Sequence, residues 1–196
     1  MPFFVSVMLM LAGYYPNNTQ ISYNAFSDEA NRIIPYSRSA KQFCEQHKYN
    51  NAVLFLVDMK IHSGKKRFFV VNMQSDSVMN SGLVAHGVCG IFFSATAGFS
   101  NAPGVGCSSL GKYKIANKYK GRFGTAYKLY GLDSTNSNAF KRNVVLHSYY
   151  EVPDDEIYPA HVCNSQGCPM VSATFLKALA QIIDDSKKPI LLWIVN

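Results

Sequence analysis

Residues 52–85, AVLFLVDMKIHSGKKRFFVVNMQSDSVMNSGLVA, decide the fold class of this chain. They contain three runs of apolar, β-branched and aromatic residues, at 52–58, 67–74 and 78–85. Short sequences rich in Ser, Gly and Asp separate the runs, and this punctuation is typical of consecutive strands joined by turns. The stretch therefore predicts a β-rich domain.

The segments on either side add helices and further strands. A helical pattern from about Ala25 to Tyr49 is expected in two pieces, because Pro35 removes a backbone donor and clashes with the preceding turn. Ser172 is a suitable N-cap for a second helix at 173–184. We expect an α+β, β-rich fold with N-terminal helices and one C-terminal helix before the last strand. Further strands are expected near 111–115, 126–132, 143–147 and 190–195, and a long Gly/Ser/Ala/Asn-rich loop at 87–106.

Length and composition indicate one globular unit. The 196 residues, 48% apolar and 16% charged, suit a single domain with a sizeable core. We expect residues 1–20 to be an apolar N-terminal segment and loop, and residues 21–196 to form one domain that includes the N-terminal helices. The apolar run 2–13 is too short to span a membrane, which takes about 20 residues. It resembles the apolar part of an export signal, but no Lys or Arg precedes it, so a buried N-terminal strand remains equally open.

Charge and cysteine usage limit the partners. The net charge of +7 favours polyanions, but no compact Lys/Arg block and no nucleic-acid-binding motif is present, so no nucleic-acid partner is expected. Five cysteines leave one thiol over after any pairing in a secreted protein; alternatively, all five are reduced and mostly buried. No pair has CxxC spacing, and neither a metal nor an organic cofactor is implied.

The residues with the clearest chemistry are His147 and Cys168. His147 ends an apolar run, and Cys168 lies in the sequence Ser165-Gln166-Gly167-Cys168-Pro169. A cysteine needs a nearby imidazole to become a nucleophilic thiolate at neutral pH. A preceding glycine lets the backbone turn, so that the N–H groups of Gly167 and Cys168 face a developing oxyanion. The alternative is a buried cysteine and an unrelated surface histidine.

The order and spacing of these residues resemble a known family. His147, residues 148–164 and Ser165-x-Gly167-Cys168 resemble the signature of the L,D-transpeptidase (YkuD-like) catalytic domain. Further segments are similar to the branch labelled murein L,D-transpeptidase. The resemblance covers roughly residues 53–195 and is strongest at 83–171. The segments similar to the murein L,D-transpeptidase branch are Val84-Ala85-His86-Gly87, Phe99-Ser100-Asn101-Ala102-Pro103-Gly104, Ser108-Ser109-Leu110-Gly111-Lys112-Tyr113, Leu129-Tyr130-Gly131-Leu132-Asp133 and Asn138-Ala139-x-x-Arg142.

The resemblance implies a β-sandwich-like catalytic domain that acts on peptidoglycan stem peptides. It assigns the nucleophile to Cys168, the base to His147, and the motif serine and glycine to Ser165 and Gly167. The cysteine would form a thioester at the L-centre of an L,D peptide bond, and an amine from a second stem peptide would resolve it. Such an enzyme would be exported to the bacterial periplasm or cell envelope. A backbone carbonyl often orients the histidine in this family, so solvated turn positions are expected for Asp133, Asp154 and Asp155.

Two positions depart from the family pattern, and four residues are candidates for substrate binding. Ser148 stands where the family usually has glycine, and Gln166 where this branch often has a bulky residue. Further substrate-binding candidates are Arg142, which would bind a stem-peptide carboxylate or form a structural ion pair, and His86, which would line the cleft or be a structural histidine. Ser148 beside the base and Tyr149 as a cleft wall complete the candidates.

Two alternative functions remain open. One is an L,D-carboxypeptidase or amidase-like hydrolase on the same scaffold, because water exclusion decides between transfer and hydrolysis. The other is a catalytically inactive wall-binding protein, for which Ser148 is the hint.

Overall fold

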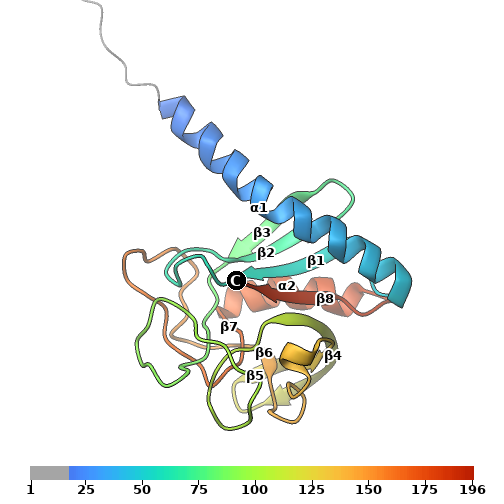
Figure 1. The fold of residues 1–196 in the computed structure, drawn as a ribbon, viewed down its shortest axis with the longest axis vertical. Helices are drawn as coiled ribbons and strands as arrows, with labels where there is room; N and C mark the ends of the chain where they lie inside the picture. The colour runs from blue at the N-terminus through green and yellow to red at the C-terminus, as the bar shows by residue number, and fades with distance from the viewer. Residues whose placement is uncertain (1–17) are drawn as a thin grey trace, which may run out of the picture.

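The computed structural model describes residues 18–196, with residues 18–31 described only as part of the first helix. It is built on one eight-stranded sheet with two α-helices and one 3-10 helix (Figure 1). The predicted apolar segment 2–13 lies outside the described residues. The elements are α1 (Asn18–His47), β1 (Val53–Asp58), β2 (Phe68–Asn72), β3 (Ser77–Gly82), β4 (Gly111–Gly121), β5 (Gly124–Gly131), η1 (Ser134–Asn136), β6 (Val145–Ser148), β7 (Met170–Val171), α2 (Ala173–Asp185) and β8 (Leu191–Val195).

The last strand lies in the middle of the sheet. The strand order is β3-β2-β1-β8-β4-β5-β6-β7, with β8 parallel to β1 and antiparallel to β4. The strand β7 is short and pairs in parallel with β6 at the far edge. The C-terminal strand therefore joins the half formed by β1–β3 to the half that carries His147 and Cys168.

Strand alternation gives the sheet an apolar surface on both faces. Phe55 and Val57 of β1 share a core with Phe175 and Leu179 of α2. Leu54 and Leu56, which point to the opposite face, pack in a second core with buried residues of α1. Complete burial of each such side chain stabilises the fold by about 1.5–3 kcal/mol. The two helices therefore cover opposite faces of the β1–β2 region. The α1 residues in that core are Ile33, Ala40 and Cys44.

The structure confirms the α+β, β-rich prediction and the helix before the last strand. The side-chain oxygen of Ser172 accepts a hydrogen bond from the backbone N–H of Phe175 at 3.1 Å, as an N-cap does. The sandwich implied by the resemblance takes the form of one continuous sheet, whose two halves share a core with α2.

The predicted break at Pro35 is wrong. The helix α1 continues through Pro35 from Asn18 to His47. A proline inside a helix costs about 3 kcal/mol. The burial of Ile33 and Cys44 against the sheet offsets this cost, because tertiary packing supplies most of the stability of a protein helix.

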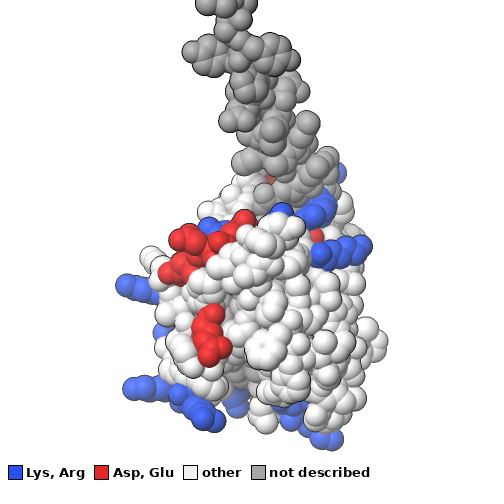
Figure 2. Space-filling model, turned by 90° about the vertical axis from the view of Figure 1, so that its left-hand side faces the viewer, with Lys and Arg blue, Asp and Glu red and all other residues white. Residues whose placement is uncertain are grey.

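Charge is distributed unevenly over the sheet and its connections. The β4–β5 hairpin, residues 111–131, contains six Lys or Arg and no Asp or Glu. The connection between β6 and β7 has the opposite character, with four exposed acidic residues. Figure 2 shows acidic side chains gathered on one face of the molecule, with most of the visible Lys and Arg side chains toward its margins. The acidic residues of the connection are Glu151, Asp154, Asp155 and Glu156.

Candidate active site

The pairing of β6 with β7 brings Cys168 next to the strand that carries His147. His147 lies opposite Met170 in this parallel pair. Cys168 is two residues before Met170, so the register places it next to Val145, two residues before His147. Accordingly, the backbone N–H of Val145 donates to Cys168 Sγ at 3.4 Å. His147 and Cys168 line the same cavity of about 230 Å³.

The imidazole of His147 is held in one orientation. Its Nδ1 lies 3.0 Å from the carbonyl oxygen of Ser148. Because that carbonyl only accepts, Nδ1 carries the hydrogen and Nε2 is left with a free lone pair. The Phe123 ring stacks on the imidazole with 5.2 Å between ring centroids. His147 is 5% exposed, and burial lowers its pKa, while the bond to the Ser148 carbonyl acts in the opposite direction. The ring is therefore a neutral base at neutral pH.

Cys168 is a thiol in the resting site. Burial raises the pKa of Cys168, and the Val145 N–H and the charge of Arg142 oppose this shift. Its Sγ also lies 3.8 Å from the carbonyl oxygen of Asn143. A neutral thiol and a neutral imidazole that line the same cavity suit proton transfer at the moment of attack, rather than a permanent ion pair.

The turn before Cys168 depends on the hydroxyl of Ser165. The backbone N–H of Gly167 donates to Ser165 Oγ at 3.0 Å, and Gly167 has a φ of +110°. Ser165 itself is buried, and its N–H donates to the carbonyl of His86 at 2.8 Å. This arrangement differs from our expectation, because a local serine turn already engages the Gly167 N–H. The N–H of Cys168 donates to no group of residues 32–196, so of the expected pair it is the N–H that stays available to an oxyanion.

The departure at Ser148 introduces no backbone strain. Ser148 lies in β6 and is not among the described residues with positive φ. It orients His147 through its carbonyl, a group that glycine and serine share.

The site also contains an aromatic residue that we did not predict from the sequence. Phe123, at the tip of the β4–β5 hairpin, lines the cavity and covers the base. Tyr149, the expected cleft wall, contacts Phe123 edge-on, with ring centroids 5.5 Å apart. Tyr149 is not a lining residue of the cavity and supports Phe123 from the side. The sequence feature that could have indicated Phe123 is Arg122-Phe123-Gly124, which places an aromatic residue in a turn between two strands.

Comparison with known proteins identifies the family. The chain matches the family model described as the L,D-transpeptidase catalytic domain over residues 18–193. It belongs to the L,D-transpeptidase catalytic domain family. This confirms the resemblance seen in the sequence and extends it to include α1. The family acts on peptidoglycan.

The solved structures that match this chain are distant from it in sequence. The helical cell shape determining protein Pgp2 from Campylobacter jejuni (K307A mutant) matches at 14% identity and a TM-score of 0.48, over 74% of this chain and 48% of that chain. An L,D-transpeptidase from Mycobacterium smegmatis matches at 15% identity and a TM-score of 0.43, over 74% of this chain and 59% of that chain. The chain thus spans about half the length of the Campylobacter protein. A search of curated proteins gave no match.

Arg142, which the sequence suggested as a substrate-binding residue, is bonded to the protein's own loops. Its Nη1 donates to the carbonyl of Ser100 at 3.0 Å and to the hydroxyl of Ser109. Its Nη2 donates to the carbonyl of Cys107. Binding of a stem-peptide carboxylate by Arg142 stays a prediction, while the observed bonds make the guanidinium a link between loops.

His86 lies behind the 165–168 turn and does not line the cavity that contains Cys168. It is 1% exposed, and Arg67 Nη2 donates to its Nδ1 at 2.8 Å. Burial and the charge of Arg67 lower the pKa of His86 to about 4. A neutral ring then carries its hydrogen on Nε2, which lies 3.2 Å from the side-chain amide nitrogen of Asn164. Both nitrogens are donors, so a hydrogen bond here requires the Asn164 amide to be turned until its otherwise unpartnered oxygen accepts. These contacts fit a structural role, and substrate binding by His86 stays a prediction.

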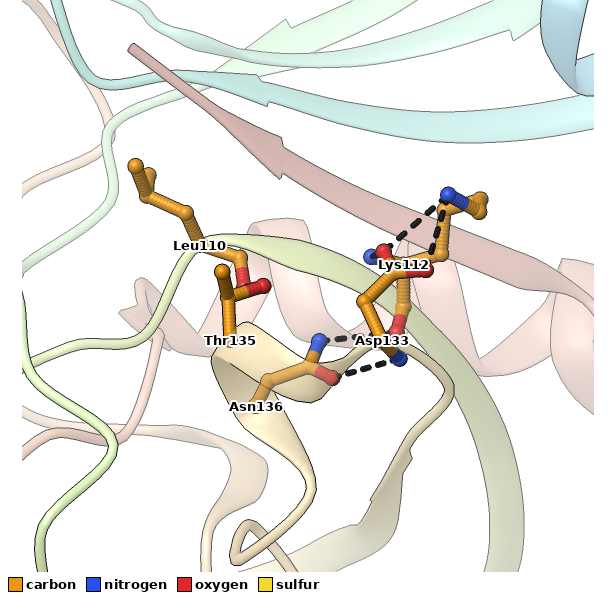
Figure 3. A network of polar contacts seen from close by, with 5 residues as sticks. All are labelled: Leu110, Lys112, Asp133, Thr135 and Asn136. Atoms are coloured by element: carbon orange, nitrogen blue, oxygen red, sulfur yellow. Dashed lines mark hydrogen bonds and ion pairs between the residues drawn. The ribbon is translucent and has the colours of Figure 1, made fainter.

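Asp133 is bonded to neighbouring residues, whereas Asp154 and Asp155 are exposed. Asp133 belongs to a network that ties η1 to β4 (Figure 3). Its carboxylate accepts from the backbone N–H of Lys112 at 2.7 Å and pairs with the Lys112 ammonium at 2.9 Å. Asn136 completes the network by donating to the Lys112 carbonyl at 2.8 Å. Asp154 and Asp155 are exposed. Among the side chains that the structure describes, those of residues 32–196, there is no group of three or more His, Cys, Asp or Glu that could hold a metal ion.

Proposed function

We propose that this protein is a cysteine-dependent L,D-transpeptidase that cross-links peptidoglycan stem peptides. The observation that carries the proposal is one cavity lined by both Cys168 and His147, with Nδ1 of the base held by a carbonyl and Nε2 free. The proposal assigns Cys168 the role of nucleophile and His147 the role of an oriented base that accepts its proton.

The reaction follows in two half-steps. Nε2 of His147 takes the thiol proton as Cys168 Sγ attacks the carbonyl at the L-centre of the donor peptide. The Cys168 N–H stabilises the oxyanion, and collapse expels the terminal D-residue, whose amine takes the proton from His147. The resulting thioester is attacked by the amine of a second stem peptide, which passes its proton back through His147 to the departing sulfur. The thiol and the neutral imidazole are thereby restored.

Hydrolysis on the same scaffold is the second candidate. If water enters the acyl-enzyme in place of the amine, the same residues give an L,D-carboxypeptidase or an amidase-like hydrolase. An inactive wall-binding protein is the third, but Ser148 gives it little support, since only the carbonyl of Ser148 contacts the base.

Purified protein incubated with tetrapeptide muropeptides should form cross-linked dimers, because the cavity combines a nucleophile with a base. Chromatography with mass spectrometry would separate the products. Tripeptides alone would indicate hydrolysis, and unchanged substrate with an intact fold would contradict both enzymatic proposals.

We also place the protein in the bacterial periplasm or cell envelope. Peptidoglycan lies there, and a disulfide joins Cys89 to Cys107, which suits an oxidising compartment. No helix among the described residues is long and apolar enough to cross a membrane.

The resting state predicts a particular pH profile. The rate constant kcat/KM should rise from acidic pH with a midpoint below about 6.5, the ordinary histidine pKa, because burial lowers the pKa of His147 and only the neutral ring accepts the proton. It should then stay level to about pH 8.5, since the raised pKa of Cys168 keeps the thiol protonated until His147 removes its proton. Initial rates measured across this range would test it. Rapid alkylation of Cys168 by iodoacetamide below pH 7 would instead reveal a preformed thiolate and contradict the prediction.

A further inference from the structure

The turn that carries the proposed nucleophile rests on two other segments, residues 86–89 and 106–108. The Cys89–Cys107 disulfide joins these two segments covalently. The other three cysteines of the chain, Cys44, Cys163 and Cys168, are free. The disulfide therefore lies directly behind the 165–168 turn, and none of its atoms is a lining atom of the cavity.

The first segment holds the turn by backbone hydrogen bonds. The N–H of Val88 donates to the carbonyl of Ser165 at 2.9 Å, and Gly87 forms a parallel bridge with Ser165. The N–H of Cys89 donates to the carbonyl of Gly106 at 3.2 Å, which links the first segment to the second.

The second segment touches the turn backbone against backbone. A Cβ added to Gly167 would lie 2.6 Å from the carbonyl oxygen of Cys107. A Cβ added to Gly87 would lie 2.3 Å from the carbonyl oxygen of Gly106. Such approaches require glycine, and any shift of residues 106–108 is passed directly to Gly167. Gly167 is the neighbour of Cys168.

Arg142 also holds the carbonyl oxygen of Cys107. Its Nη2 donates to Cys107 O, and a Cβ on Gly167 would lie 3.0 Å from that nitrogen. Arg142 directly precedes Asn143, whose carbonyl lies near Cys168 Sγ. Arg142 therefore connects the disulfide segment to the start of β6.

The loop between the two bonded cysteines is hydrogen-bonded to the rest of the protein at Ser100 and Asn101, but its tip is exposed. Ile91, Phe92 and Phe93 at its tip are 68%, 72% and 76% exposed. Burial of apolar side chains thus contributes little to fixing this part of the loop, and the covalent bond replaces it.

We propose that the Cys89–Cys107 disulfide and Arg142 are positioning groups that hold the 165–168 turn, so that the thiol and N–H of Cys168 face the cavity. The proposal rests on the proposed function. It predicts that breaking the disulfide leaves the sulfur accessible but impairs the reaction that needs the aligned N–H.

Two reactions of Cys168 separate alignment from access. Acylation, by a carbapenem or by the tetrapeptide donor, needs the oxyanion donor in place; alkylation by iodoacetamide does not. In a Cys89→Ser/Cys107→Ser variant we expect acylation to slow by about tenfold to a hundredfold, the range that a displacement near 1 Å produces. Alkylation of the Cys168 peptide, followed by mass spectrometry, should change by no more than about twofold. Arg142→Lys, which keeps the positive charge that acts on Cys168 but loses the forked guanidinium, should show the same split with the disulfide intact.

Cys163→Ser is the matched control, since it removes a nearby thiol that is outside the disulfide. If the double variant does not fold, wild-type protein can be reduced and reoxidised, and acylation should fall and recover in the same sample. Unchanged acylation without the disulfide would overturn the proposal, and so would an equal loss of acylation and alkylation. A wild-type protein that makes no product from the tetrapeptide would refute the proposed function, whereas an active wild type with an unaffected double variant would refute only the positioning role.

Discussion

Replacing Cys168 with alanine is expected to abolish both dimer and tripeptide formation from muropeptides. The substitution removes the atom that would form the thioester, and no other described residue that lines the cavity is a cysteine, serine or threonine. The rate should fall to background, a loss of at least about a thousandfold for a missing nucleophile. Product analysis by mass spectrometry would measure it.

A second variant separates lost chemistry from lost structure. The sulfur accepts a hydrogen bond from the Val145 N–H, which alanine leaves without that partner. Cys168→Ser keeps an acceptor of similar size, so we expect an unchanged melting temperature and still no product, because a hydroxyl is a weak nucleophile without strong activation. Substantial turnover in either variant would show that another residue is acylated.

Replacing His147 with alanine should lower kcat/KM at neutral pH by at least about a hundredfold, the usual contribution of a general base. The thiol would then have to ionise unaided, and burial keeps the pKa of Cys168 raised. Activity in the variant should increase with pH as the free thiolate forms. Steady-state rates from pH 6 to pH 10 would show this change of profile.

Chemical rescue gives a sharp control for the histidine. The cavity of about 230 Å³ gains further space when the ring is removed, and Phe123 remains as a stacking surface. Added imidazole should therefore restore part of the activity of His147→Ala and leave Cys168→Ala inactive. Full turnover by His147→Ala without imidazole would show that the base lies elsewhere.

Local patterns in the sequence predicted most of the fold. Apolar runs bounded by turn residues predicted β1, β2 and β8, because the central strands are buried on both faces. The strand β7 was not predicted, since a strand of two residues depends on its partner β6 rather than on propensity. The continuity of α1 through Pro35 was missed for a similar reason: packing of the helix against the sheet outweighs a local preference.

The sequence predicted the chemically reactive residues of the candidate site better than the residues that hold them in place. The family motif specifies residue types in a fixed order, so Cys168, His147 and Ser165 could be named as candidate site residues from the sequence. The partners of Arg142 and His86 lie in loops distant in the sequence, and only the folded chain brings Cys107 and Arg67 next to them. The Cys89–Cys107 pairing was likewise undetermined by the sequence, because four cysteines beside Cys168 allow three full pairings.

The lysine- and arginine-rich β4–β5 hairpin also borders the reaction cavity, through Tyr119, Arg122 and Phe123. The β6–β7 connection contains four acidic residues and no Lys or Arg, so these two segments carry opposite charge. Stem peptides end in carboxylates. The electric field of these carboxylates would rotate the approaching protein until its basic hairpin faces the peptide. This torque acts within a Debye length of about 8 Å at physiological salt. Collisions in dilute buffer should thus be oriented more often than collisions in brine, before any specific contact has formed.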